Sequence, residues 1–98
     1  ALKAIENMIV AKVHIIIVVA GMEGALGSFV SSVTDLPVVG VPTSIGYGFA
    51  SNGIAALASM LQTCTMGLTV VNIDNGIGAG AFAAMVANKM SAEYKNAI

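Results

Sequence analysis

Three short runs of β-branched, apolar residues are the strongest constraint on how this chain can fold. The first is VHIIIVVA from Val13 to Ala20, the second is VVGV from Val38 to Val41, and the third is TVVNI from Thr69 to Ile73. Near-continuous apolar runs of this length are typical of strands buried on both faces, as in parallel sheets covered by helices. The chain therefore predicts a parallel sheet with helices on either side of it.

Helical periodicity appears before, between and after these runs, because apolar residues recur there at spacings of three and four. The residues that carry it are Leu2, Ile5 and Ile9; Leu26, Phe29, Val30 and Val33; Ile54, Leu57 and Leu61; and Phe82, Val86 and Met90. Helix and strand thus alternate, which predicts an α/β fold with three layers, helix on sheet on helix. We expect a single domain over residues 1–98. It shows only three strands and opens on a helix, so we expect it to be truncated, with its first strand–helix units missing.

Charged residues are scarce and unevenly placed. Only 9% of the 98 residues are charged, whereas a soluble domain carries about a quarter. Glu23, Asp35 and Asp74 are the only charges between Val13 and Asn88. A monomer surrounded by water would spread charge along every helix, so we expect the middle of the chain to face other protein, in a homo-oligomer or a larger domain. A net charge of −1 with no Arg excludes a nucleic-acid partner.

Membrane insertion and secretion are not expected. Pro, Gly, Ser, Thr and Asn interrupt the uncharged stretch from Leu36 to Ile73, so that no apolar run approaches the ~20 residues that span a bilayer. The opening residues ALKAIENMIVAK are amphipathic and carry both signs of charge, unlike a secretory signal. The sequence therefore predicts no membrane segment and a cytoplasmic location.

A Gly-rich segment follows each predicted strand: AGMEGAL at 20–26, PTSIGYG at 42–48 and DNGIGAG at 74–80. Ligands of open parallel sheets bind at the carboxyl ends of the strands. Glycine lets the backbone approach a ligand, and N–H groups at a helix start attract anions. Three such segments at one edge favour a binding cleft over simple chain turns. The candidate lining residues are Gly21, Met22, Gly24, Thr43, Ser44, Gly46, Tyr47, Asn72, Asn75, Gly76 and Gly78.

Two carboxylates and one thiol are the candidate reactive groups. Glu23 and Asp74 each follow a strand in a region nearly free of charge, where desolvation raises proton affinity and suits proton transfer. Each is equally compatible with capping the adjacent helix, and the sequence leaves both alternatives open. Cys64 is the only cysteine, which excludes an intrachain disulfide and a multi-cysteine metal site. Composition alone favours a buried, inert thiol there, and a structural role for the only histidine, His14.

Three motifs in order, VVAGMEGAL, DLPVVGVPTSIGYG and LASMLQTCTMGLTVVNIDNGIGAG, closely resemble the carboxy-terminal part of the LarB family of nickel-pincer cofactor biosynthesis proteins. The resemblance covers roughly Val13 to Gly80. It implies the PurE-like, flavodoxin-like fold shared with aminoimidazole ribonucleotide (AIR) carboxylase, and an octameric homo-oligomer. It also implies a pyridinium carboxylase and phosphoanhydride hydrolase. Nicotinic acid adenine dinucleotide and carbon dioxide or bicarbonate would give pyridinium-3,5-biscarboxylic acid mononucleotide and AMP.

The resemblance also implies roles for individual residues. Cys64 falls in the cysteine motif of the family and would be the transient nucleophile, and Glu23 would move the ring proton. Asp74 would be a supporting carboxylate or would contribute to metal-assisted hydrolysis. A divalent ion such as Mg²⁺ fits that hydrolytic step, although the metal ligands stay unknown from sequence, and no organic cofactor is expected.

Several departures and alternatives stay open. Gly27 stands where the family commonly has proline. The upstream strand expected to hold substrate phosphate is outside these 98 residues, so we expect the chain alone to be inactive. A PurE-type carboxylase of purine biosynthesis is the nearest alternative, but Ala25 occupies the position of its catalytic histidine. A noncatalytic oligomeric binding module is the other alternative. Cys64 connects a helix to the next strand and should lie at the amino edge, opposite Glu23 and Asp74, which predicts a composite site between subunits.

Overall fold

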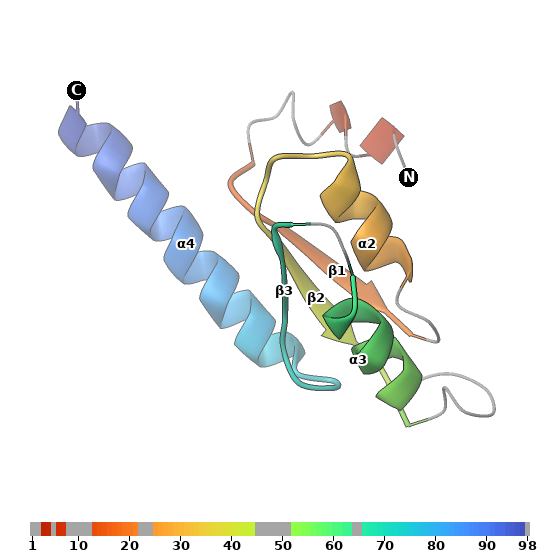
Figure 1. Ribbon diagram of the computed structural model, residues 1–98. Coiled ribbons are helices and arrows are strands. Elements are labelled where there is room, and N and C mark those ends of the chain that lie inside the picture. Colours follow the sequence, from red (N-terminus) through yellow and green to blue (C-terminus); the bar gives the residue numbers. More distant parts are fainter. Residues whose placement is uncertain are drawn as a thin grey trace.

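The computed structural model describes residues 3–4, 6–7, 13–21, 25–44, 52–63 and 66–97, with the backbone alone for residues 25, 26, 28 and 93–97. Residues 3–4 and 6–7 are helical, as the amino-terminal periodicity predicts. The elements that follow are β1 (Ile16–Ala20), α2 (Ala25–Ser32), β2 (Val38–Pro42), α3 (Ile54–Leu61), β3 (Leu68–Val70) and α4 (Gly76–Ala97). Their arrangement is shown in Figure 1.

The strands form one parallel sheet in the order β1-β2-β3, so β2 is central. β1 begins three residues later than the first apolar run does. Its pairing starts where the Ile16 N–H donates to the Pro37 carbonyl at 3.0 Å, and Val38 is the first residue of β2. Residues 13–15 therefore have no neighbouring strand to pair with. Pairing between β2 and β3 likewise ends at Val70, which makes the third strand shorter than the predicted run to Ile73.

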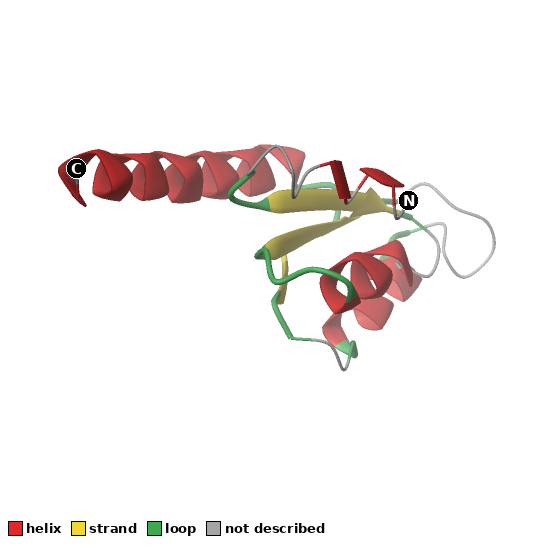
Figure 2. Cartoon of the chain, turned by 90° about the horizontal axis from the view of Figure 1, so that it is seen from above, coloured by secondary structure: helices red, strands yellow, loops and turns green. Residues whose placement is uncertain are grey.

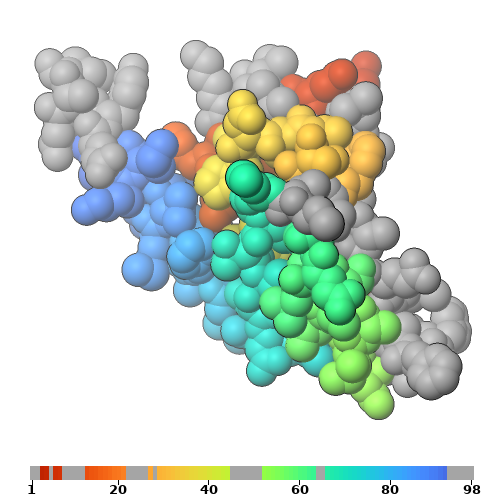
Figure 3. Space-filling view, viewed as in Figure 1, coloured from red at the N-terminus to blue at the C-terminus, as the bar shows by residue number. Residues whose placement is uncertain are grey.

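Helices cover both faces of the sheet, which confirms the predicted α/β fold with helix, sheet and helix layers. The connections β1–α2–β2 and β2–α3–β3 join parallel neighbours in sequence order. Because such crossovers are right-handed, both helices lie on the same face, and α4 lies on the other (Figure 2). In the space-filling view, α2, α3 and the β3 segment form the face toward the viewer, with α4 along one side (Figure 3).

The core between the sheet and α3 is built on a methionine rather than on the predicted apolar face. Met60 and Ala56 are buried, whereas Ile54 and Leu61 are 60% and 65% exposed. The reason lies in the central strand, because a Cβ added to Gly40 would come within 2.9 Å of the Met60 sulfur. A glycine inside a strand marks a close approach, and here it leaves room for a long flexible side chain. Ile54 and Leu61, whose spacing predicts the helix, therefore lie away from this core.

The opposite face of the sheet is only partly covered. Val39 and Val41 pack there with Ala79 of α4, but Ile17 and Val19 of β1 are 40% and 60% exposed. The expectation of burial on both faces is thus correct for β2 and wrong for β1 within a single chain. α4 crosses the sheet with its first turns and then projects past it (Figure 1). Within the described part of the chain, no helix is both long and apolar enough to cross a bilayer.

Candidate functional site

The residues that follow the three strands meet at one edge of the sheet, where both α3 and α4 begin (Figure 1). Backbone hydrogen bonds continue the ladder beyond the strands themselves. The Thr43 N–H donates to the Ala20 carbonyl at 3.0 Å, and the Asp74 N–H donates to the Pro42 carbonyl at 2.8 Å. The segments after β1, β2 and β3 are therefore held side by side, as the carboxyl-edge cleft requires.

Asp74 and Ser44 form the main polar contact at this edge. The Ser44 backbone N–H donates to Asp74 Oδ1 at 2.9 Å, and the Ser44 hydroxyl lies beside the same carboxylate. Asp74 has a φ of 62°, a left-handed conformation that Asp adopts more readily than most residues because its side chain bonds locally. The Ser44 hydroxyl first, and then the Ser44 N–H, favour the charged form and lower the pKa of Asp74, although slight desolvation opposes them. The carboxylate is therefore ionised at neutral pH.

Asn75 caps α4, which settles one alternative for Asp74. Asn75 Oδ1 accepts the Gly78 N–H at 3.0 Å, and the Asn75 carbonyl accepts the Ala79 N–H at 3.1 Å. Gly78 is required here, because a Cβ on it would overlap the Asn75 side-chain amide. Asn is among the preferred N-cap residues, and an Asn before the start of a predicted helix is a sequence signal for such a cap. The Asp74 carboxylate binds Ser44 across the sheet edge, and the cap comes from its neighbour.

Gly53 is a residue of this edge that the sequence reasoning missed. It precedes α3 with a φ of 80° and is buried. A Cβ placed on it would lie 2.5 Å from Ile73 Cγ2 and 3.1 Å from the Thr43 carbonyl oxygen. Gly53 thus lets the start of α3 pack against the segments after β2 and β3. The signal available in the sequence is an Asn-Gly pair immediately before a helix.

Comparison with known proteins identifies the family. The AIR carboxylase family profile matches residues 1–98. The chain belongs to the AIR carboxylase family. It is also 54% identical, over 87 residues, to an uncharacterized protein of Methanocaldococcus jannaschii, an alignment that covers 89% of this chain and 33% of the relative. The chain thus spans about a third of the length of that curated relative.

Membership of the AIR carboxylase family shows a PurE-like domain. Of the predicted site residues, the structure brings together Thr43, Ser44, Asp74 and Asn75 at the carboxyl edge. Gly21 and Asn72 lie in the same post-strand segments, and Asn72 Oδ1 accepts the Ile73 N–H at 2.8 Å. Gly76 and Gly78 lie in the first turn of α4. The remaining predicted residues lie outside the described residues: Met22, Glu23, Gly24, Gly46, Tyr47 and Cys64.

The opposite, amino edge of this AIR carboxylase-like sheet holds the described residues that flank the cysteine motif. α3 ends at Leu61, and the Gly67 carbonyl accepts the N–H of Val38, the first residue of β2, at 2.8 Å. Ser31, Thr34, Asp35 and Met66 line a small polar cavity there with Gly67 and their neighbours. The described residues on either side of residues 64–65 therefore lie at the amino edge.

The described residues do not assemble a divalent-metal site. No three His, Cys, Asp or Glu side chains gather among them. Asp74 is the predicted metal-assisting carboxylate, and its Oδ1 already accepts the Ser44 N–H. A divalent ion needs several oxygen ligands, and the described residues do not bring them together.

The Asp74–Ser44 contact gives a direct pH prediction. Ser44→Ala removes the hydroxyl, which is the largest cause of the lowered pKa, so we expect the pKa of Asp74 to rise toward the ordinary Asp value of about 3.9. In the unmodified protein the contact is present at neutral pH and is lost as the pH falls through the lowered pKa. Carboxyl ¹³C NMR titration measures this shift. Ser32→Ala is the control, because Ser32 lies on α2 and its hydroxyl donates to the Phe29 carbonyl of the same helix. An unchanged Asp74 titration in Ser44→Ala would contradict the assignment.

Proposed function

We propose that this member of the AIR carboxylase family carboxylates a pyridinium ring, with nicotinic acid adenine dinucleotide and carbon dioxide or bicarbonate as substrates. It would also hydrolyse the phosphoanhydride, yielding the biscarboxylated mononucleotide and AMP, as in the LarB branch. The observation that carries the proposal is a lone cysteine, Cys64, within LASMLQTCTMGLTVVNIDNGIGAG, in a domain of a carboxylase family.

The chemistry requires a thiolate. A pyridinium ring is electrophilic, and addition of the Cys64 thiolate beside the ring nitrogen forms a C–S bond and a neutral, enamine-like dihydropyridine. The neighbouring ring carbon then attacks carbon dioxide and forms the new C–C bond. A base removes the proton from that carbon, and the thiolate leaves with the C–S electron pair. The pyridinium is thereby restored without any change of redox state.

Glu23 is the proposed base, and Cys64 would reach it across a subunit boundary. The positions of these two residues relative to the sheet support this arrangement. Glu23 follows β1, whose carboxyl end lies at the edge described above, whereas the described residues flanking Cys64 lie at the amino edge. Partners in proton transfer must come within hydrogen-bond reach, directly or through one water. A neighbouring copy that inserts its cysteine segment into this edge would satisfy that requirement.

The PurE-type reaction on aminoimidazole ribonucleotide is the second candidate, and the family match itself favours it. The position of its catalytic histidine is Ala25 in this chain, and the described histidine, His14, precedes β1 at the amino edge. A noncatalytic oligomeric binding module is the third candidate. It would retain the fold and bind nucleotide without turnover.

One assay separates these candidates. The protein at its full natural length is incubated with nicotinic acid adenine dinucleotide and bicarbonate, and AMP and the carboxylated mononucleotide are quantified by mass spectrometry. Formation of both products supports the proposal. Turnover of aminoimidazole ribonucleotide instead would favour the PurE-type reaction, and nucleotide binding without any turnover would favour the binding module.

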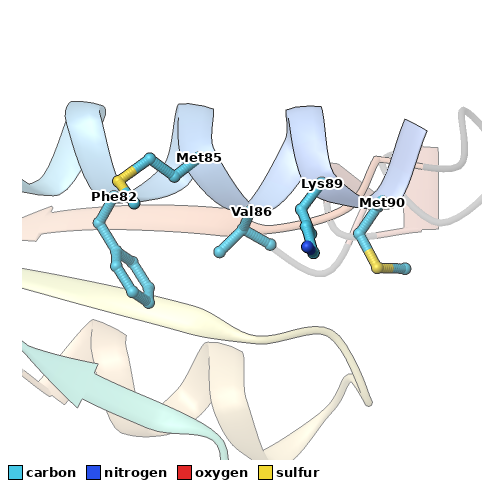
Figure 4. A pocket seen from close by; sticks show the side chains of 5 residues that line it. All are labelled: Phe82, Met85, Val86, Lys89 and Met90. Atoms are coloured by element: carbon cyan, nitrogen blue, oxygen red, sulfur yellow. The ribbon is translucent and has the colours of Figure 1, made fainter. Parts of the chain in front are cut away.

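We also propose that the protein is a homo-oligomer, with a surface on the α4 side of the sheet as a subunit contact. On α4, this surface is a shallow apolar groove lined by Phe82, Met85, Val86, Lys89 and Met90 (Figure 4). The exposed Ile17 and Val19 of β1 complete the α4-side surface. Phe82, Val86 and Met90 point from the same side of α4 in that view. Monomeric proteins rarely expose large contiguous apolar patches, and such patches mark interaction sites. The scarcity of charge along the chain favours another copy of the same chain as the partner.

Phe82→Asp is expected to weaken this self-association, because it places a charge in the middle of an apolar contact. Sedimentation velocity over a concentration series is the measurement, and we expect the dissociation constant to rise at least about tenfold. Ser91→Asp is the matched control, since Ser91 is exposed and lies half a turn around α4 from Phe82 at 100° per residue. Equal behaviour of the two variants, or a monomeric parent protein, would overturn this assignment of the surface.

A further inference from the structure

α3 is apolar on both its inward and its outward side. The inward side packs against the sheet through Ala56 and Met60. The outward side exposes Ile54, Ala58 and Leu61, which form one stripe because residues three and four positions apart are neighbours on a helix surface. A helix that is apolar all round is typical of a buried helix rather than one that faces water.

α2 lies beside α3 in the same layer, and both helices are on the face that Figure 3 shows. Neither helix contains a charged residue. Ser32, an exposed polar side chain of α2, donates its hydroxyl to the Phe29 carbonyl at 2.7 Å, so covering it leaves no hydroxyl donor unpaired. The α2–α3 face is defined here by the exposed side chains of Phe29, Ser32, Ile54, Ala58 and Leu61.

The absence of charge restricts what can cover the α2–α3 face. A charged group of a partner would lose its hydration there without meeting an opposite charge, which is costly. The apolar groove on α4 is therefore a poor match, because Lys89 lines it. The α2–α3 face of a second copy is a good match, since two uncharged faces meet without repulsion. A contact between two identical surfaces also closes on itself around a two-fold axis.

The stripe on α3 indicates how the two copies meet. Ala58 is small and lies between the larger Ile54 and Leu61, so two α3 helices approach each other most closely there. With the two-fold axis running across the helices at Ala58, the two α3 helices are antiparallel. Ile54 of one copy then packs beside Leu61 of the other, which alternates large and small side chains as close packing requires. Antiparallel helices also bring opposite ends of their dipoles together.

We propose that the α2–α3 face binds the same face of a second copy, with the two α3 helices antiparallel around Ala58. Both α2 and α3 run from the carboxyl edge of the sheet to the amino edge (Figure 1). The contact therefore places the amino-edge end of α3 in one copy toward the carboxyl edge of the other, where α2 begins. In the sequence, Cys64 follows the end of α3 and Glu23 precedes the start of α2. The contact thus supplies the neighbouring copy that the proposed reaction calls for, but it does not itself depend on that reaction.

Cysteine cross-linking tests both the contact and its direction. Ala58→Cys is made in the Cys64→Ala protein at its full natural length and oxidised with copper phenanthroline. We expect a disulfide between copies, because Ala58 lies at the two-fold axis and Cα atoms less than about 7 Å apart can be bridged. Nonreducing gel electrophoresis measures the covalent dimer. Ser91→Cys in the same background is the matched control, since Ser91 is exposed on α4, across the sheet.

Leu61→Asp tests the contact without a new thiol. Leu61 is exposed in a single chain, so the fold tolerates the change, whereas the contact would bury the new carboxylate against a second copy. Sedimentation velocity should show the mass of the assembly reduced at least about twofold, because one two-fold contact is lost. Ser91→Asp should leave the mass unchanged.

Four results would overturn the proposal. Cross-linking of Ala58→Cys no stronger than that of Ser91→Cys would exclude the antiparallel contact. An unchanged mass in stable Leu61→Asp protein would show that no second copy covers the face. A loss of thermal stability in Leu61→Asp at unchanged mass would show that another part of the same polypeptide covers it, and a monomeric parent protein would exclude any contact between copies. The formation of AMP and the carboxylated mononucleotide is measured separately, so failure of the contact is distinguishable from failure of the proposed function.

Discussion

Cys64→Ala is expected to abolish the covalent adduct with nicotinic acid adenine dinucleotide and to lower turnover at least about a thousandfold. Loss of the attacking group in enzymes with covalent catalysis costs factors of this size or more, because the remaining groups cannot replace the bond that the nucleophile forms. The adduct is detected by intact-protein mass spectrometry and AMP by its release. Circular dichroism of the variant is the folding control. Full turnover by folded Cys64→Ala protein would exclude the thiolate mechanism.

A mixing experiment tests whether Cys64 acts within its own chain or in the site of a neighbouring copy. Cys64→Ala and Glu23→Gln each remove one proposed reactive group, so each homogeneous variant should be inactive. If the site is composite, mixed oligomers contain some sites that combine an intact Cys64 from one copy with an intact Glu23 from another. Co-expression should then restore part of the activity. No recovery from verified mixed oligomers would place both groups within one chain.

Much of the fold could be predicted because strand position depends on local sequence. The β-branched runs gave three parallel strands in sequence order, and helices alternate with them as the periodicity indicates. Which face of α3 packs could not be predicted from its periodicity. That choice depends on Gly40, which lies in another element and admits Met60 against the central strand. The exposure of Ile17 and Val19 also depends on how far α4 reaches across the sheet, which local periodicity does not determine.

The candidate site, like the fold, could be predicted only where local sequence determines it. The rule that ligands gather at strand carboxyl ends predicts that Thr43, Ser44, Asp74 and Asn75 lie at one edge, as they do. The sequence left open whether Asp74 caps a helix or serves the site, because both use a carboxylate after a strand. The structure shows that Asn75 provides the cap and that the Asp74 carboxylate contacts Ser44, 30 positions away. Long-range hydrogen bonds of this kind leave no trace in local sequence.

Gly53→Ala is expected to destabilise the protein by about 2–5 kcal/mol, a large part of the ~5–15 kcal/mol that holds a domain of this size folded. A non-glycine residue in the left-handed region costs about 1–2 kcal/mol, and Gly53 has a φ of 80°. The added Cβ also meets Ile73 Cγ2 at 2.5 Å, and overpacking of this kind typically adds about 1–3 kcal/mol. Urea unfolding followed by circular dichroism gives the free-energy difference.

Gly80→Ala is the matched substitution, and we expect it to stabilise the protein rather than destabilise it. Gly80 lies inside α4, and a Cβ there meets nothing within 4 Å. Replacing glycine by alanine in a helix interior stabilises by up to about 1 kcal/mol. The two variants add the same methyl group, so their difference isolates backbone conformation and contact with Ile73. Equal stability of the two variants would mean that the α3 start does not pack against the segments after β2 and β3. Nucleotide affinity should fall in Gly53→Ala and stay unchanged in Gly80→Ala. The added Cβ of Gly53→Ala displaces Ile73 and Thr43, and their chain neighbours Asp74 and Ser44 form the polar contact of the site.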